Sequence, residues 1–293
     1  MTPAAVDRAY LEGMVDRYLA ALVAHDPSRL PLAKTIKFTE NTIPLPVGEA
    51  LWQTASDLPT YRLIACDPRN GQTGFFAFMK ENGFPIILAA RLKIVRDEIT
   101  EIETIVVREG ARPIPEDNMK QVKPLYLQAL KPSEKVSREE MLRVSDLYFD
   151  ALEQDNADIV PFYPECNRVE NGMQTTNNPD LFLTPEGDTP MPTDCIGQIN
   201  AKTFIYIASI RPRHWTVVDE ERGLTFGTFV FHHKGPLRSF TLPDGTERQI
   251  IPIAQRPFTV AVMELFKIQN GRIREIEANM VSLPYGAGSG WDD

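Results

Sequence analysis

The chain has 293 residues, 43% of them hydrophobic, and a formal net charge of −9, which suits about two domains with a core each. The charge and the scattered Lys and Arg residues argue against a nucleic-acid-binding protein, which needs clustered basic side chains. No apolar run approaches the roughly 18 residues of a membrane span, and residues 1–8 lack the apolar region of a signal peptide, so we expect a cytoplasmic protein without a membrane contact.

The first third of the chain predicts one long helix followed by antiparallel strands. Apolar residues recur at helical spacing from Val6 to Leu22, and Pro27 marks the end of that helix. Strand-like runs lie at residues 35–42, 61–66, 74–80, 86–95 and 99–108, with a short helix at residues 48–55. A helix that precedes a run of antiparallel strands is an α+β pattern.

Residues 111–136 are rich in proline and match no other part of the chain, so we interpret them as a linker, with a helical turn at residues 121–130. Ser137 and Glu140 then have the spacing of a capping box and open a second long helix, because each side chain can bond an exposed N–H group of the first turn. The buried stripe of this helix is expected to contain Met141, Val144, Tyr148, Phe149 and Leu152.

The end of the chain predicts a β-hairpin, because two strand-like runs, at residues 259–268 and 272–280, flank Asn270 and Gly271. An Asn-Gly pair supplies the positive φ angles of a tight hairpin turn. A related hairpin is expected at residues 89–104, with its turn at Arg96 and Asp97. The two hairpins match at one constant offset.

Further repeats precede both hairpins: residues 16–22 match residues 146–152, and the Glu-Asn pair at 40–41 recurs at 170–171. The distance between these repeats is as long as a domain, which indicates a duplicated domain. We therefore predict a first domain at residues 1–110 and a second at residues 137–293.

The second predicted domain carries two insertions, at residues 175–194 and 237–256, and the latter resembles a hairpin around residues 243–245. Segments of this length are often lids or binding loops. They could equally be interface arms.

These features resemble the nuclear transport factor 2-like superfamily, in its polyketide cyclase-like, or SnoaL-like, branch. Residues 18–25, 38–41, 264–268 and 271–275 carry the resemblance, which covers most of both repeats. It implies an α+β fold of two tandem cone-shaped domains, each a curved antiparallel sheet wrapped around helices and enclosing an apolar pocket. The superfamily includes dehydratases, isomerases, cyclases, epoxide hydrolases and many non-catalytic members.

The tandem arrangement is also similar to that of the cofactor-free γ-formaldehyde lyases that act on lignin-derived diarylpropanes. This chain departs from the superfamily pattern in its final strand, where Ile276 stands at a position that many members give to histidine.

Glu264 is the first candidate for catalysis. Side chains alternate along a strand, so Glu264 shares a face with the four apolar residues two and four positions away from it. Burial among them would raise its pKa and suit it to act as a general base or acid. The first repeat has Ala90 at the matching place, so we expect any catalysis in the second. The alternative is a partly exposed or ion-paired glutamate at a sheet edge.

His232 and His233 are candidate proton-transfer groups, because imidazole titrates near neutral pH. Both lie at the end of a strand, so their side chains are expected to point to opposite faces. The pattern leaves open which of the two reaches a pocket.

Residues 206–215 form the densest polar and aromatic cluster of the chain. We predict that Arg211 and His214 assist catalysis and that Tyr206 and Trp215 bind an aromatic substrate. The alternative is that the arginines of this cluster pair with the acidic residues 219–221.

The other candidates for substrate binding are Arg168 and Asn171, which follow the second long helix, and the strand residues Phe229, Phe231 and Phe266. Recurrence of the Glu-Asn pair in both repeats favours a structural turn for that pair, so Arg168 is the stronger candidate.

No metal or organic cofactor is expected. The four histidines show no HxH or HxxxH spacing. The three cysteines form no CxxC pair, which is typical of a reduced cytoplasmic protein. Residues 286–290 are Gly-rich, but no helix follows them as a phosphate loop requires, so we interpret them as a flexible tail from which Trp291 docks back.

Two function hypotheses follow. The first is a cofactor-independent lyase, dehydratase or isomerase that acts on a small aromatic substrate by proton transfer, most sharply by γ-formaldehyde elimination from a lignin-derived aromatic dimer. The second is a non-catalytic small-ligand-binding or assembly protein. Either would be a monomer of fused domains or a homo-oligomer.

Overall fold

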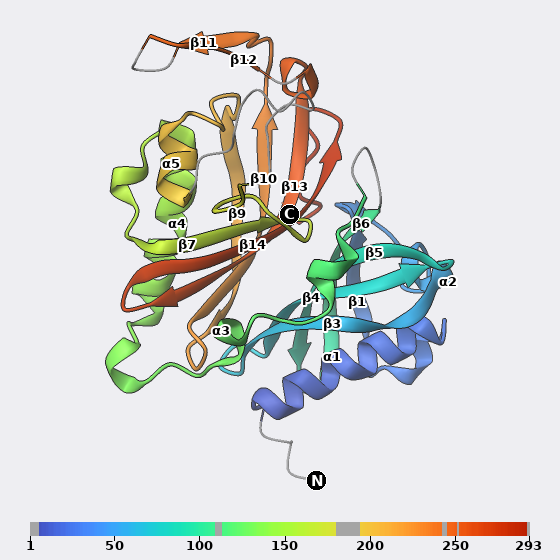
Figure 1. Cartoon of the computed structure of the whole chain (residues 1–293). Coiled ribbons are helices and arrows are strands. Elements are labelled where there is room, and N and C mark those ends of the chain that lie inside the picture. Colours follow the sequence, from blue (N-terminus) through green and yellow to red (C-terminus); the bar gives the residue numbers. More distant parts are fainter. Residues whose placement is uncertain (1–5, 109–112, 180–193, 242–244, 251, 292–293) are drawn as a thin grey trace.

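The computed structural model describes residues 6–108, 113–179, 194–241, 245–250 and 252–291. Two six-stranded sheets dominate it, and a long helix packs against each (Figure 1). The first sheet runs in the order β2 (Ile43–Pro44), β1 (Leu32–Glu40), β6 (Glu98–Arg108), β5 (Phe84–Val95), β4 (Gln72–Glu81) and β3 (Ala55–Asp67). The second runs in the order β8 (Met173–Gln174), β7 (Phe162–Glu170), β14 (Arg272–Leu283), β13 (Phe258–Gln269), β10 (Leu224–His233) and β9 (Ser209–Asp219).

The two sheets share one topology. β1 pairs with β6 in parallel, β7 pairs with β14 in parallel, and the other neighbouring strands are antiparallel. This arrangement confirms the predicted fold class, α+β with two tandem curved sheets around helices. The short helix predicted at residues 48–55 is reduced to α2 (Leu51–Thr54), because β3 already begins at Ala55.

Both predicted long helices are present, as α1 (Arg8–Val23) and α4 (Arg138–Gln154). Each begins after a residue whose side chain accepts a hydrogen bond from a backbone N–H of the first turn, Asp7 in one case and Ser137 in the other. The short helical elements are η1 (Pro27–Arg29), η2 (Glu116–Met119), α3 (Pro124–Leu127), η3 (Pro132–Glu134), η4 (Ala157–Ile159), α5 (Cys195–Asn200) and η5 (Pro252–Gln255).

Tight turns close both long hairpins as the sequence predicts. Asn270 and Gly271 have φ angles of 52° and 67°. Arg96 and Asp97 adopt φ angles of 52° and 64° without a glycine. Two successive positive φ angles match the right-handed twist of the strands that they connect.

The first half of the molecule comprises α1 and the first sheet, and the second half comprises α4 and the second sheet. The two insertions of the second half are described in part. β11 (Ser239–Thr241) pairs with β12 (Glu247–Gln249), which confirms the predicted hairpin pairing; residues 242–244 lie outside the described residues. Of the other insertion, residues 180–193 lie outside the described residues.

Each helix covers the inner face of its own sheet, and the outer faces of the two sheets pack against each other. Apolar side chains of both sheets form this central layer, in which the rings of Phe76 and Phe226 lie 5.5 Å apart. Two ion pairs flank it: Arg8 donates to Asp219 at 2.6 Å, and Arg138 donates to Asp67. The sheets therefore contact each other through equivalent surfaces, as in a two-fold dimer interface.

Residues 113–136, which fall in the predicted linker, and the tail at residues 286–291 pack against the two sheets. Met119 and Tyr126 of the linker are buried in the layer between the sheets, and α3 confirms the predicted helical turn. Trp291 docks on the first half, where its Nε1 donates to Thr39 Oγ1 at 3.0 Å and the Arg91 guanidinium lies 4.7 Å from its ring centre.

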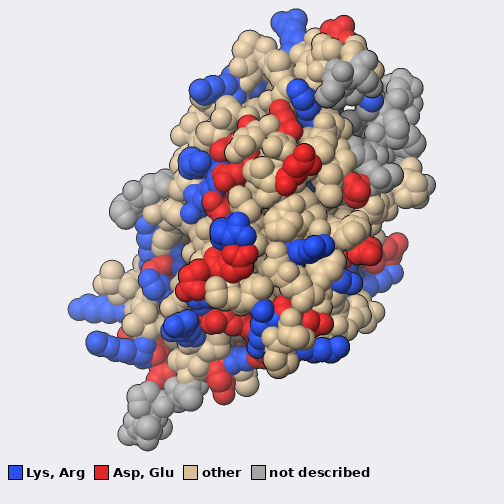
Figure 2. Space-filling model, turned by 90° about the vertical axis from the view of Figure 1, so that its left-hand side faces the viewer, with Lys and Arg blue, Asp and Glu red and all other residues tan. Residues whose placement is uncertain are grey.

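On the face that Figure 2 shows, acidic and basic side chains are interspersed. Among the described residues, no helix has both the length and the apolar character to cross a membrane.

Candidate functional site

Glu264 lies on the inner face of β13, inside the core of the second half. Its carboxyl group is 0% exposed, and neither oxygen has a hydrogen-bond partner among the described residues. Its neighbours on the adjacent strands are Gly227 and Ala278, and Val262 and Phe266 flank it on β13 within the same apolar cluster. A buried polar group without a partner is rare in folded proteins, and such a group calls for an explanation.

Arg168, on the inner face of β7, is the cation nearest to that carboxylate. Its side chain is 4% exposed, and its Nε lies 3.9 Å from Glu264 Oε1, which is longer than a hydrogen bond. The guanidinium also forms an ion pair with Glu170 and lies 5.1 Å from the ring centre of Phe204. Arg168 therefore sits between two carboxylates, one buried and one near the surface.

Burial controls the protonation of the Glu264 carboxyl group. It raises the pKa of Glu264 to about 7, and the charge of Arg168 opposes that shift. Burial likewise raises the pKa of the Tyr148 hydroxyl, on α4, which lies close enough to Arg168 for the cation to oppose the shift. At neutral pH, Glu264 can therefore either accept or donate a proton, whereas Tyr148 stays protonated.

The first half lacks this charged pair. In the first sheet, Ala90 of β5 pairs with Thr104 of β6. In the second sheet, Glu264 of β13 pairs with Ala278 of β14 in the equivalent way. Phe38 lies opposite Ile102 in the same parallel pairing that sets Arg168 opposite Ile276. Both positions of the pair are thus apolar and buried in the first half.

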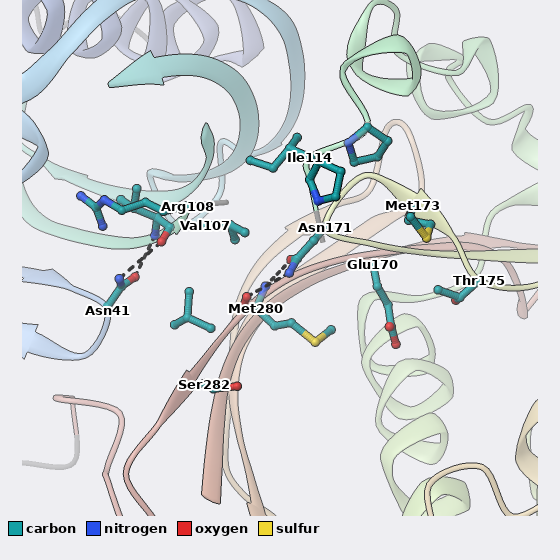
Figure 3. Close-up of a pocket in the computed structure, with 14 residues that line it drawn as sticks. Asn41, Val107, Arg108, Ile114, Glu170, Asn171, Met173, Thr175, Met280 and Ser282 are labelled. Atoms are coloured by element: carbon teal, nitrogen blue, oxygen red, sulfur yellow. Dashed lines mark hydrogen bonds between the residues drawn. The ribbon is translucent and has the colours of Figure 1, made fainter. Parts of the chain in front are cut away.

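A pocket of about 500 Å³ lies at the junction of the two halves, next to Glu170. Figure 3 shows Asn41 and Arg108 on one side of it and Glu170, Met173 and Thr175 on the other. Its remaining lining is largely apolar and comes from β6, the linker and β14: Val106, Val107, Pro113, Ile114, Pro115, Met280 and Val281. Through Glu170, the pocket wall is connected to Arg168 and from there to Glu264.

Asn171 also lines this pocket, but its side chain is engaged in structure. Its amide accepts from Met280 N at 2.8 Å and donates to Met280 O at 3.2 Å (Figure 3). Asn41 makes the equivalent bonds with Val106 in the first half. This matches the structural turn that recurrence of the Glu-Asn pair favoured.

The structure does not bring the predicted catalytic partners to Glu264; no contact in the described part of the chain joins them to it. Arg211 is exposed and pairs with Glu153 at 3.1 Å, and His214 lies on the same strand, β9. The alternative pairing with residues 219–221 is wrong for Arg211, because its cation meets α4, the helix that covers β9. Arg213 binds the same helix, at 2.8 to 3.1 Å from three acidic side chains.

The adjacent histidines point to opposite faces, as alternation predicts. His232 is half-buried, with Nδ1 3.2 Å from Thr259 Oγ1 and Nε2 3.0 Å from the carbonyl of Arg211. His233 is buried and stacks on Phe258 with ring centres 4.0 Å apart. Burial lowers the pKa of His233 to about 4, so this imidazole is neutral at physiological pH.

The predicted aromatic residues belong to the apolar core of the second half or pack against it. Phe229, Phe231 and Phe266 belong to the apolar cluster that contains the neighbours of Glu264. Trp215 packs 5.6 Å from Phe266 and donates its Nε1 to Asp146. Tyr206 lies 5.1 Å from His233, and burial raises its pKa.

The sequence did not identify two members of the site. Tyr148 was predicted only as part of a buried stripe, although its recurrence as Tyr18 between Asp and Ala-Leu was visible. Glu170 was set aside as a turn residue. Among the described residues, no group of three or more His, Cys, Asp or Glu side chains could hold a metal ion.

Comparisons with solved structures find small domains that each match about half of this chain. The epoxide hydrolase/cyclase-like enzyme SalBIII is 11% identical, with 50% of this chain and 93% of that chain covered and a TM-score of 0.31. IdmH, a proposed polyketide cyclase from Streptomyces antibioticus, is 14% identical, with 48% and 91% covered and a TM-score of 0.30. A proposed isomerase from Bacillus subtilis is 9% identical, with 49% and 87% covered and a TM-score of 0.29. The fold of this chain is defined by its own two six-stranded sheets.

A search of curated proteins finds no significant match. A family model described as "Domain of unknown function (DUF8021)" matches residues 134–280, half of the chain. The match includes α4, β7 and β13, and with them Tyr148, Arg168 and Glu264. The chain therefore belongs to the DUF8021 family, through the half of the molecule that holds the buried ion pair.

Proposed function

We propose that the second half is a cofactor-independent lyase, dehydratase or isomerase that works by proton transfer. Glu264 is the acid–base group, and Arg168 stabilises the negative charge that develops on a substrate oxygen. The observation that carries the proposal is the exchange of this pair for Phe38 and Ala90 in the equivalent core. A buried ion pair is often no more stable than apolar residues of similar volume, so stability alone gives no reason for the pair.

The protonation of Glu264 suits this role. With a pKa of about 7, both of its forms are populated at neutral pH, which is where an acid–base catalyst works best. Arg168 stays cationic at any physiological pH. A substrate oxygen that becomes an anion can replace Glu170 as its partner, so binding and charge stabilisation use the same guanidinium.

The substrate is proposed to be small, largely apolar and aromatic, and to enter from the junction pocket. The pocket has the volume of typical ligand sites, roughly 300–1,000 Å³, and its apolar lining suits an aromatic ring. The apolar core around Glu264 includes Trp215, Phe229 and Phe266, on which aromatic rings can pack edge to face.

The most specific reaction that we propose is γ-formaldehyde elimination from a lignin-derived aromatic dimer. Glu264 takes the proton of the terminal hydroxyl group, and the carbon–carbon bond to that carbon breaks as formaldehyde forms. The released electron pair makes a carbon–carbon double bond, and the benzylic hydroxyl leaves beside Arg168 as hydroxide. The proton held by Glu264 converts this hydroxide to water and regenerates the carboxylate.

The test is an assay of formaldehyde release and of substrate loss with a panel of diarylpropane diols. Glu264→Gln should keep the fold and lower turnover by roughly 10²-fold, the usual scale for general base catalysis. Wild-type kcat/KM should rise as the pH passes about 7, where Glu264 becomes the carboxylate. Ala90→Ser, at the equivalent place in the first half, is the matched control and should leave turnover nearly intact. Full activity of Glu264→Gln would make this residue merely structural.

The second candidate is a small-ligand-binding protein without catalysis. It is favoured by the pocket, which lies between the two halves and contains none of the unpartnered buried groups. Calorimetric titration of the protein with the same diols distinguishes the binding protein from the enzyme. Binding that Met280→Trp abolishes and Glu264→Gln leaves unchanged, without any turnover by the wild type, would support this candidate.

A further inference from the structure

Two of the three cysteines lie in contact inside the second half. Cys166 of β7 and Cys195, the first residue of α5, are 1% and 2% exposed. The Cys195 thiol donates to Cys166 Sγ at 2.9 Å and lies 3.2 Å from the Cys166 carbonyl oxygen. The sulfur atoms of a disulfide bond are about 2.05 Å apart, so a movement of about 1 Å would join them.

We propose that Cys166 and Cys195 form a disulfide bond when the chain folds in the presence of a thiol–disulfide couple such as glutathione. In this reaction, one thiolate attacks oxidised glutathione and releases one reduced glutathione. The second thiolate then attacks the mixed disulfide and releases another. Two cysteine thiols thus lose two protons and two electrons, and one oxidised glutathione becomes two reduced molecules.

The bond should form during folding rather than afterwards. Burial raises the pKa of the Cys166 thiol well above its usual range, so the folded domain holds little of the thiolate that reacts. Before α5 packs on β7, both thiols are exposed and react at their ordinary pKa. The third cysteine, Cys66, belongs to β3 in the other half, where its backbone N–H donates to Asp219.

The bridge would fix the strand that carries Arg168. Cys166 and Arg168 lie two residues apart on the inner face of β7, so a covalent link from Cys166 to α5 limits the movement of that strand. It also closes a chain segment with a sequence separation of 29 residues, which restricts the unfolded chain and thereby stabilises the fold. This effect does not depend on whether Glu264 is catalytic.

The experiment refolds the full chain with a mixture of reduced and oxidised glutathione, and in parallel with reduced glutathione alone. After thiol alkylation under denaturing conditions, peptide mass analysis should show Cys166 joined to Cys195 and Cys66 alkylated in the first sample, and three alkylated cysteines in the second. The bridged protein should unfold at a melting temperature several degrees higher.

Cys66→Ser is the matched control and should keep the bridge and the shift in melting temperature, whereas Cys195→Ser should lose both. Three alkylated cysteines after oxidative refolding, or a bridge that includes Cys66, would overturn the proposal. This readout uses the wild-type chain, so it holds even if a serine variant fails to fold.

Discussion

The two halves of this molecule have the same topology but different residues at two equivalent positions of their cores. Phe38 and Ala90 complete an apolar core in the first half at the positions that Arg168 and Glu264 occupy in the second. The topology around them is otherwise the same. The first half therefore shows that the inner core of this architecture closes without charged residues at these two positions, so the charged pair of the second half needs a reason other than folding.

The free energy of burying charges makes this difference between the halves significant. Two charges removed from water lose hydration, and their attraction restores it only when the geometry is good and the remaining polar atoms are bonded. Glu264 and Arg168 are separated by 3.9 Å, and the Glu264 oxygens have no hydrogen-bond partner among the described residues. Such a pair suits a site that is completed by a ligand, as proposed above.

The largest expected effect comes from breaking the pair on one side. Arg168→Ala leaves the Glu264 carboxyl buried without its cation, which typically costs about 3–5 kcal/mol. Chemical denaturation at pH 8 measures this loss. The loss should shrink at pH 5, because Glu264 can then be protonated and neutral.

Phe38→Ala is the matched change in the first half and removes only apolar contacts. Its cost, roughly 3–5 kcal/mol for a buried phenylalanine, should be the same at both pH values. A pH-independent loss for Arg168→Ala would mean that the charge of Glu264 does not matter.

A second expected difference is the pH dependence of stability. The folded chain keeps a proton on Glu264 up to a pH of about 7, whereas the unfolded value is 4.5. The folded state therefore binds more protons between these values, and the free energy of unfolding falls as the pH rises through this window. The fall from Glu264 is about 3 kcal/mol. Glu277, whose pKa burial also raises to about 7, contributes in the same direction.

Glu264→Gln should remove the Glu264 part of this slope and leave that of Glu277. Denaturation of both proteins at pH 5 and pH 8 provides the comparison. An unchanged slope in the variant would show that Glu264 titrates normally and is not buried as described.

A smaller effect is expected at a feature that the two halves share, the asparagine that bonds the neighbouring strand. Asn41→Ala and Asn171→Ala each remove a side chain that bonds a backbone N–H at 2.8 Å. Each should lower the free energy of unfolding by about 1–3 kcal/mol, and the two losses should be similar. A loss of turnover in Asn171→Ala larger than in Asn41→Ala would restore the predicted substrate-binding role of Asn171.

Local sequence signals were sufficient for much of the fold. Asn270-Gly271 predicted its turn, Ser137 predicted the start of α4, and strand alternation placed Glu264 on an inner face. In each case, the determining interaction lies within a few residues along the chain.

The partners of Glu264 could not be predicted in this way. Arg168 reaches it through the parallel pairing of β7 with β14, which joins segments about 110 residues apart, and no local period encodes that contact. Arg211, from the predicted cluster, pairs with Glu153 and not with Glu264, because β9 lies at the sheet edge, two strands from β13. The contact between Cys166 and Cys195 is long-range for the same reason.

The most direct test places the two core residues of the first half at the equivalent positions of the second half. The double variant Arg168→Phe with Glu264→Ala replaces the buried pair by the residues found at the equivalent positions. We predict that its free energy of unfolding at pH 8 is unchanged or higher, by up to about 4 kcal/mol, and that its turnover falls by roughly 10²-fold or more. A variant that loses several kcal/mol of stability, or that keeps full turnover on a confirmed substrate, would contradict this prediction.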